Sequence, residues 1–153
     1  IGFIAEAFQR ANLENWDLVI AGGESKHFKS HEQMQHPNIK WIGYQDEETL
    51  EKLYNEAALF VSASHYEGFG IPVLEAMQHG CEIALSRIPV YTELFSAHIH
   101  YFDLHDPSGL AEIMKDIASK PLKPISHAYT LSTFNYGTSA NKMATVITQI
   151  LND

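Results

Sequence analysis

Ser64-His65-Tyr66-Glu67-Gly68-Phe69-Gly70-Ile71-Pro72-Val73-Leu74-Glu75-Ala76-Met77 is the stretch around which the chain is organised. An apolar run over residues 58–63 precedes it and predicts a buried strand. A helix is expected to begin at Pro72 and to stop at Gly80, because proline suits a first helical turn and glycine suits the end. The stretch therefore joins a strand to a helix. In a parallel sheet such turns lie at the carboxyl end of the strands, where α/β proteins bind ligands.

Strand and helix patterns alternate along the whole chain. Strands are predicted at residues 17–21, 39–44, 58–63, 82–86 and 99–103. Helices are predicted at residues 1–11, 46–57, 72–79, 90–97 and 106–118, with a weak surface helix at 24–35, a proline-marked loop from 121 and a last helix at 139–151. This alternation predicts a Rossmann-like α/β fold, with a mostly parallel sheet covered by helices on both faces.

Composition limits the classes of partner. The 153 residues suffice for one domain with a real core, and the formal net charge of −9 argues against nucleic acid or an anionic membrane surface, which both need clustered Lys and Arg. The single cysteine, Cys81, can form no internal disulfide, which favours a reducing compartment. No apolar run approaches the roughly 20 residues that a membrane span needs. The chain opens with Ile1 inside a helical pattern, so we expect the numbering to begin within a longer protein.

The chemistry of the central turn indicates a ligand with phosphate and polyol parts. Gly68 and Gly70 lack Cβ atoms, so a ligand can approach the backbone amides closely. The following helix directs its unpaired N–H groups and positive dipole end toward the turn. Glu67 and Glu75 are acceptors when ionised and suit the hydroxyl groups of sugars and riboses. The alternative is an ordinary glycine-rich turn, in which Glu75 stabilises the helix start with no ligand bound.

The pattern of Glu67, seven intervening residues and Glu75 resembles the signature of the retaining GT4-type glycosyltransferases, which have the GT-B fold. Four further segments resemble that family, at residues 18–23, 42–44, 89–94 and 102–110. The resemblance covers about residues 1–120 and is weaker beyond them.

The resemblance implies that residues 1–153 form a single nucleotide-sugar-binding domain, one half of a GT-B fold, closed by a loop and helix at 121–153. The first strand of that domain, and the N-terminal domain that holds the acceptor, would lie outside this sequence. The implied reaction moves a sugar from a nucleoside-diphosphate sugar to a carbohydrate or lipid-linked acceptor, with retention, in polysaccharide or lipopolysaccharide synthesis. No metal cofactor, nucleic acid or transmembrane segment is implied. The expected location is cytoplasmic, with any peripheral membrane contact made through the N-terminal domain.

The resemblance also assigns site residues. Glu67 would lie near the transferred sugar and the diphosphate, and Glu75 would hold the ribose hydroxyls. The remaining donor-binding positions would be Gly68, Phe69, Gly70 and Ile71 beside the sugar, Gly43 and Tyr44 near the base, and Gly22 and Gly23 along the pyrophosphate cleft. The family's basic Arg and Lys pair does not fall within this sequence, so Lys26 and Arg87 are the candidate substitutes.

Three other functions stay open. A non-catalytic sugar-nucleotide-binding module would share this fold, and so would a sugar-nucleotide epimerase. A flavodoxin-like signalling receiver would need an acidic cluster after its first strand, which the sequence does not display.

Histidine and cysteine give weaker signals. His27 and His31 have metal-ligand spacing without a third ligand, so we expect a solvated pair. His98 and His100 are interpreted as surface residues, and Cys81 as a small core residue. His65 either touches the donor or is a hydrogen-bonded loop residue.

Overall fold

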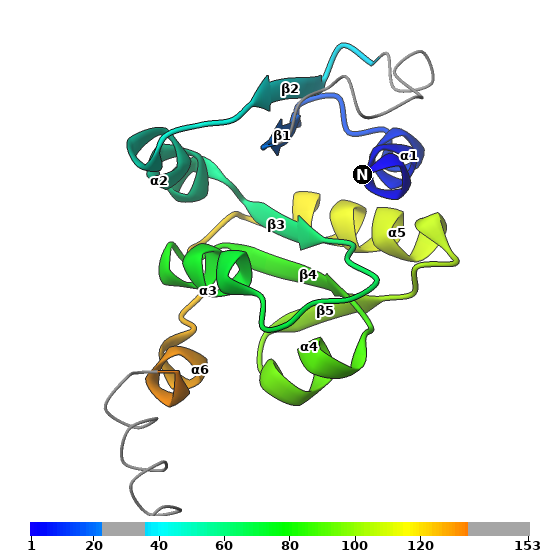
Figure 1. Ribbon diagram of the computed structural model, residues 1–153. Helices are drawn as coiled ribbons and strands as arrows, with labels where there is room; N and C mark the ends of the chain where they lie inside the picture. Colours follow the sequence, from blue (N-terminus) through cyan, green and yellow to red (C-terminus); the bar gives the residue numbers. More distant parts are fainter. Residues whose placement is uncertain (23–35, 135–153) are drawn as a thin grey trace, which may run out of the picture.

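The computed structural model describes residues 1–22 and 36–134, and its elements alternate between strand and helix (Figure 1). The strands are β1 (Leu18–Ala21), β2 (Ile39–Gly43), β3 (Leu59–Ser62), β4 (Glu82–Ser86) and β5 (Ile99–Phe102). The helices are α1 (Gly2–Ala11), α2 (Glu47–Glu56), α3 (Ile71–Gln78), α4 (Pro89–Leu94), α5 (Pro107–Ala118) and α6 (Ala128–Thr133). The five predicted strands are confirmed. The helices predicted at 24–35 and 139–151 lie outside the described residues.

The strands form two parallel sheets. β1 pairs with β2, and β3, β4 and β5 pair in that order. The predicted parallel α/β fold is confirmed, although these strands make two sheets instead of one continuous sheet. β1 and β3 are the strands that face each other across the division (Figure 1). β1 pairs only with β2, and β3 pairs only with β4, so among the described strands the facing edges of β1 and β3 have no partner strand.

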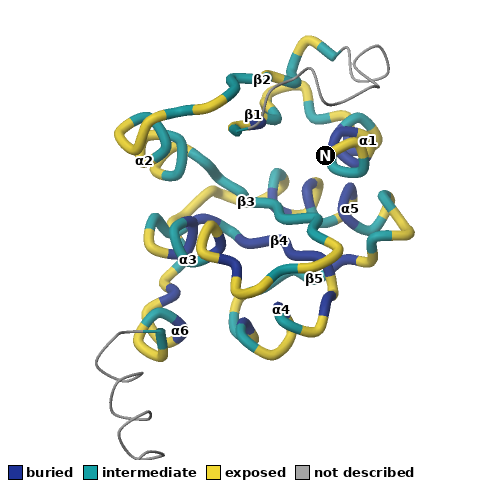
Figure 2. Tube along the Cα trace, in the orientation of Figure 1, coloured by how far each residue is buried: buried dark blue, intermediate teal, exposed yellow. Residues whose placement is uncertain are grey.

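The core lies on the two faces of β4. Ile83 and Leu85 are fully buried on the face covered by α3 and α4, whereas Ala84 is fully buried on the face covered by α1 and α5. This split follows from the period of two along a strand. Figure 2 shows β4 buried, while α2 is half-buried or exposed throughout. The three-stranded sheet is therefore a sandwich between helices, and the two-stranded sheet is less deeply covered.

The predicted helix starts are confirmed by their caps. The Asp46 carboxylate accepts a hydrogen bond from the Thr49 amide at 2.9 Å, and the Asp106 carboxylate accepts one from the Ser108 amide at 2.9 Å. Each carboxylate satisfies an amide that the helix itself leaves unpaired.

Three predictions need correction. α4 ends at Leu94, short of the predicted residue 97, and α6 occupies a stretch after Pro124 that was predicted as loop. β3 was predicted as buried, but all four of its residues are only half-buried. The reason is that β3 borders a cavity along the edge that faces β1.

Within the described ranges no helix is long and apolar enough to cross a bilayer.

Candidate functional site

The central motif forms the loop between β3 and α3, at the carboxyl end of β3 as predicted. Gly70 is the residue before α3, and its φ of +97° lies in the region that favours glycine. A Cβ atom on Gly70 would lie 2.9 Å from Cε1 of Tyr91. The sequence suggested that Gly70 lets a ligand approach, but Gly70 is buried and the Tyr91 ring occupies the space that its Cβ would take, so packing and backbone conformation are what require glycine here.

Gly68 differs from Gly70 in its surroundings. It is exposed, and a Cβ atom built on it would meet nothing within 4 Å. Phe69 and Ile71 are also exposed, at 38% and 63%. No side chain caps the start of α3, and Pro72 occupies its first turn. Gly68, Phe69 and Ile71 are therefore open to a ligand beside an uncapped helix start, whereas Gly70 is buried.

Glu67 is held by a neighbouring serine. Its side chain is half-buried, and its Oε1 accepts a hydrogen bond of 2.8 Å from the Ser64 hydroxyl. Ser64 is in turn fixed through its carbonyl, which accepts a hydrogen bond of 2.6 Å from the Ser86 hydroxyl at the end of β4. The orientation of the Glu67 carboxylate is thus tied to β3 and β4.

Glu75 lies on α3, where its Oε2 accepts a hydrogen bond of 3.0 Å from the Tyr54 hydroxyl on α2. The Tyr54 ring stacks on His79, with ring centroids 5.6 Å apart. Burial, and then the hydrogen bond to the Glu75 carboxylate, raise the pKa of Tyr54 well above its usual range. Tyr54 therefore remains a proton donor to Glu75 at neutral pH.

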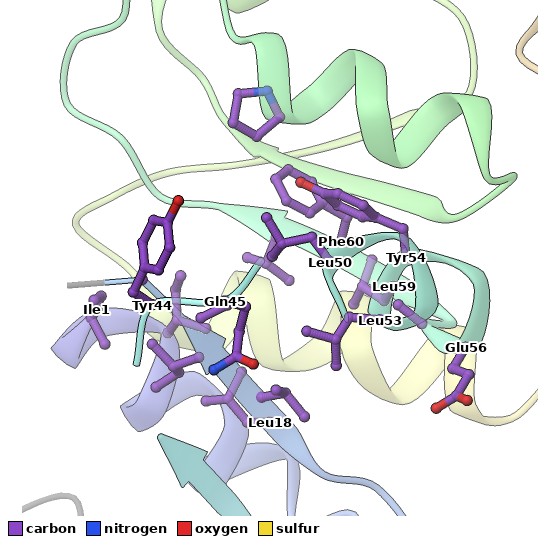
Figure 3. Close-up of a pocket in the computed structure, with 18 residues that line it drawn as sticks. Ile1, Leu18, Tyr44, Gln45, Leu50, Leu53, Tyr54, Glu56, Leu59 and Phe60 are labelled. Carbon is purple, nitrogen blue, oxygen red and sulfur yellow. The ribbon is translucent and has the colours of Figure 1, made fainter. Parts of the chain in front are cut away.

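A mostly apolar cavity of about 600 Å³ lies between the two sheets. Figure 3 shows side chains of α2 and β3 on one side of it, with Tyr44 and Ile1 on another. Gly22, Tyr44 and Pro72 all line this cavity, so the ends of β1 and β2 meet the start of α3 there. The structure thus brings together residues that were predicted for the pyrophosphate, the base and the motif helix.

The loop ends of β1 and β2 are joined directly. The Gly22 amide donates a hydrogen bond of 2.7 Å to the Gly43 carbonyl, and both glycines have positive φ values, +90° and +67°. Tyr44 follows with 89% of its surface exposed. Gly23 lies outside the described residues.

The described residues give no support for Lys26 or Arg87 as a phosphate-binding cation. Lys26 lies outside the described residues. The Arg87 guanidinium lies over the Tyr101 ring, 5.1 Å from its centroid, in a cation–π contact on β5. This contact explains the position of Arg87 without any phosphate ligand.

The histidines have mixed outcomes. His98 is exposed as predicted, whereas His100 is half-buried and its Nε2 lies 2.9 Å from Oε2 of Glu82, so the surface interpretation of His100 is wrong. The imidazole takes this place because β5 pairs with β4, the strand that carries Glu82. His65 is exposed. His27 and His31 lie outside the described residues.

The expectation for Cys81 is confirmed. Its side chain is 1% exposed, and burial raises the pKa of the thiol. In the part of the chain that the structure describes, no three His, Cys, Asp or Glu side chains cluster as metal ligands would.

Sequence reasoning missed the hydroxyl groups around the motif. Ser62, Ser64 and Tyr91 contact one another or Glu67, and Tyr54 contacts Glu75. Ser62 lies in the predicted strand and Ser64 two residues on, just after its end, and this spacing of two would place both on one face if the chain stays extended, which was the available signal. Tyr91 and Tyr54 gave no such signal, because their positions depend on how α4 and α2 pack.

The sequence matches the family described as "Glycosyl transferases group 1" over residues 3–129. "O-antigen biosynthesis glycosyltransferase WclY" from Escherichia coli is 30% identical over 118 residues, which are 77% of this chain and 32% of that protein. "O-antigen chain mannosyltransferase B" from Escherichia coli is 43% identical over 95 residues, 61% of this chain and 25% of that protein. The aligned part of this chain thus spans a third or less of these curated relatives.

Solved structures share the fold at low sequence identity. Anabaena HepE in complex with UDP superposes with a TM-score of 0.80 at 17% identity, over 97% of this chain and 44% of that one. Sucrose-phosphate synthase from Thermosynechococcus elongatus gives a TM-score of 0.75 at 19% identity, over 99% and 42%. Nearly the whole of this chain therefore has a counterpart in less than half of each of these structures.

Proposed function

Since the chain belongs to the group 1 glycosyl transferases and has the fold of one half of a GT-B enzyme, we propose that it supplies the donor site of a sugar transferase. The donor is a nucleoside-diphosphate sugar, and the sugar passes to a carbohydrate or lipid-linked acceptor in polysaccharide or lipopolysaccharide synthesis. The observation that carries the proposal is the loop with Glu67 and an exposed Gly68, followed by the helix that carries Glu75, within a chain that matches the family over residues 3–129.

The proposed role of Glu67 is to position the transferred sugar and to support the charge that develops there. Its half-buried carboxylate has a fixed orientation at the end of β3, which is what electrostatic support requires. The backbone amides around the exposed Gly68, Phe69 and Ile71 contact sugar hydroxyls or the diphosphate, because these residues lie beside the uncapped helix start. We propose transfer with retention and no metal cofactor. A chelator should then leave the rate unchanged.

The proposed role of Glu75 is to accept hydrogen bonds from the ribose. Its Oε2 is engaged by Tyr54, and a carboxylate has further acceptor sites for the two hydroxyls of the ribose. We assign Gly22, Gly43 and Tyr44 to the pyrophosphate and the base, since Gly22 and Tyr44 line the cavity between the sheets and the Gly22 amide is hydrogen-bonded to the Gly43 carbonyl. The exposed Tyr44 ring suits stacking on a base.

Relatives and structural neighbours suggest different donors. One relative, 37% identical over 90 residues, is named "GDP-mannose:cellobiosyl-diphosphopolyprenol alpha-mannosyltransferase", and others are named mannosyltransferases. The HepE structures contain UDP or UDP-glucose at 17% identity. Because the sequence relatives are more similar to this chain, we propose a mannosyl donor.

We also propose that a further strand pairs between β1 and β3 in the full-length protein. Both strands have an edge that borders the same apolar cavity, and both sheets are parallel. An extended apolar segment that runs parallel to both strands would join the two sheets into one. Slower amide hydrogen exchange in β1 and β3 of the full-length protein, compared with residues 1–153 alone, would support this organisation.

Calorimetry on the full-length protein tests the function. GDP-mannose, UDP-glucose and ADP-glucose are titrated separately, and transfer is then followed by NMR, which reports the anomeric configuration of the product. Binding of one donor followed by retained transfer is expected. Binding without transfer to any polyprenyl or oligosaccharide acceptor would favour a non-catalytic binding module. Failure to bind any sugar nucleotide would contradict the proposal.

A further inference from the structure

A chain of hydroxyl groups leads from the Glu67 carboxylate into the core. The Ser64 hydroxyl donates to Glu67 Oε1 at 2.8 Å, and Ser64 Oγ lies 3.3 Å from Ser62 Oγ. Ser62 Oγ lies 2.9 Å from the hydroxyl oxygen of Tyr91. Three consecutive contacts therefore connect a half-buried carboxylate to a tyrosine with 1% of its surface exposed.

The direction of these hydrogen bonds follows from counting protons. An ionised carboxylate only accepts, so Ser64 uses its single hydroxyl proton toward Glu67. Ser62 must then donate to Ser64, and Tyr91 must donate to Ser62, since each hydroxyl has one proton. All three bonds point toward Glu67, and bonds aligned in this way polarise one another.

The far end of the hydroxyl chain is rigid. Tyr91 lies on α4 in the core beside Phe95, Ile83 and Leu85. The Tyr91 ring also fills the space beside Gly70, so Tyr91 packs against the motif loop with its ring in addition to the contact that its hydroxyl makes with Ser62. Burial raises the pKa of Tyr91, which keeps its hydroxyl protonated and able to donate at neutral pH.

We propose that Ser64, Ser62 and Tyr91 are positioning residues that fix the Glu67 carboxylate toward the transferred sugar. This inference rests on the proposed donor-site function. It adds that the orientation of the carboxylate is set by the core and not by the donor. Ser64 contacts Glu67 directly, Ser62 contacts Ser64, and Tyr91 contacts Ser62, so all three act through that carboxylate.

The plainer explanation is that these hydroxyls merely satisfy one another inside the protein. Thr133 on α6 shows what such a role looks like, since its hydroxyl donates a hydrogen bond of 2.7 Å to the backbone carbonyl of Thr130. The Ser62, Ser64 and Tyr91 contacts instead end on an ionisable side chain in a loop whose neighbouring residues are exposed. A structural role would lower stability alone, whereas a positioning role lowers the turnover number.

The test compares variants of the full-length protein with its sugar-nucleotide donor. Ser64→Ala removes the donor to Glu67 and should lower kcat by about 10- to 100-fold. KM for the donor should stay within about 2-fold, because the lost interaction acts on the reacting sugar. Ser64→Thr keeps the hydroxyl and should restore kcat to within about 3-fold of wild type, as a bond of that kind can reform.

Tyr91→Phe removes only the terminal hydroxyl and should lower kcat by about 3- to 10-fold. The double variant Ser64→Ala/Tyr91→Phe should be no slower than Ser64→Ala alone, because Tyr91 acts through Ser64. Tyr101→Phe is the matched control. Its half-buried hydroxyl donates to the backbone carbonyls of Tyr91, at 2.7 Å, and of Phe95, and has no hydrogen bond to Glu67, so its loss should lower Tm without changing kcat.

The outcomes separate this inference from the proposed function. A Ser64→Ala protein with wild-type kcat, alongside an inactive Glu67→Ala protein, would overturn the positioning role and leave the donor site intact. An active Glu67→Ala protein would contradict the donor-site assignment and the positioning role together. If Ser64→Ala fails to fold, the kcat of Tyr91→Phe tests the positioning role in its place. A Tyr91→Phe protein with wild-type kcat would overturn the chain of hydroxyls.

Discussion

Glu67 and Glu75 belong to one motif, but they are anchored to different parts of the molecule. Glu67 is held through Ser64 and Ser62 by Tyr91, which is 1% exposed in the core of the three-stranded sheet. Glu75 is held by Tyr54, which lies on α2, a helix without a single buried residue. The two carboxylates thus differ in the rigidity of their supports.

This difference suggests a division of labour in the proposed donor site. A carboxylate fixed to the core suits the reacting sugar, where a small displacement is costly to the rate. A carboxylate held by a peripheral helix can adjust as the nucleotide enters and leaves. Substitutions at the first should therefore change turnover, and substitutions at the second should change affinity.

The largest effect is expected for Glu67→Ala. Loss of a preorganised charged group beside the reacting sugar should lower kcat by about 10²- to 10³-fold, with little change in KM. Steady-state kinetics on the full-length protein measures this. If Glu67→Ala raised KM and left kcat unchanged, the proposed difference between Glu67 and Glu75 would be contradicted.

Gly70→Ala should disturb the support of Glu67 through the core. The new Cβ would lie 2.9 Å from the Tyr91 ring at a residue whose φ is +97°. Backbone strain and overpacking together should lower the free energy of unfolding by about 3 kcal/mol, measured by urea denaturation.

Gly68→Ala is the matched control for that change. Its Cβ would meet nothing within 4 Å, so stability should change by less than about 0.5 kcal/mol. A large loss of stability in Gly68→Ala would mean that the two glycines do not differ as the structure indicates.

Glu75→Ala should raise KM for the donor by about 10- to 100-fold and change kcat much less, because bonds to a charged acceptor are lost from the ribose. Calorimetric titration of the nucleoside diphosphate alone should show the same loss. If the affinity for the nucleoside diphosphate is unchanged, Glu75 does not contact the nucleotide.

Tyr54→Phe should give the smallest effect of the series. It removes one hydrogen bond to Glu75 and keeps the ring that stacks on His79. The expected result is a KM raised by about 3- to 5-fold with an unchanged kcat. A fall in kcat instead would show that α2 also supports the reacting end of the site.

Much of the fold could be predicted from local patterns. The strand at 82–86 and the helix starts at Asp46 and Pro107 follow from apolar runs and capping residues, and the structure agrees. The half-burial of β3 could not be predicted, because it depends on what lies across the sheet edge. α6 was missed because its six residues follow two prolines and resemble a loop.

The site was predictable only in part. Glu67, Glu75 and the glycines stand out through spacing and through resemblance to a family. Their roles toward a donor stay predictions until the substitutions are made. Tyr91, which supports Glu67 through the serines, lies 24 residues after it in the sequence. Tyr54, which is hydrogen-bonded to Glu75, lies 21 residues before it, so only tertiary packing brings each tyrosine to its glutamate.

The facing edges of β1 and β3 also bear on how this part of the protein behaves in solution. Each strand pairs with a single described neighbour, and both border an apolar cavity. Free strand edges of this kind recruit strands from other molecules. A protein limited to residues 1–153 should therefore self-associate as its concentration rises, despite a net charge of −9. Light scattering would detect this, and an added polypeptide that covers both edges should suppress it.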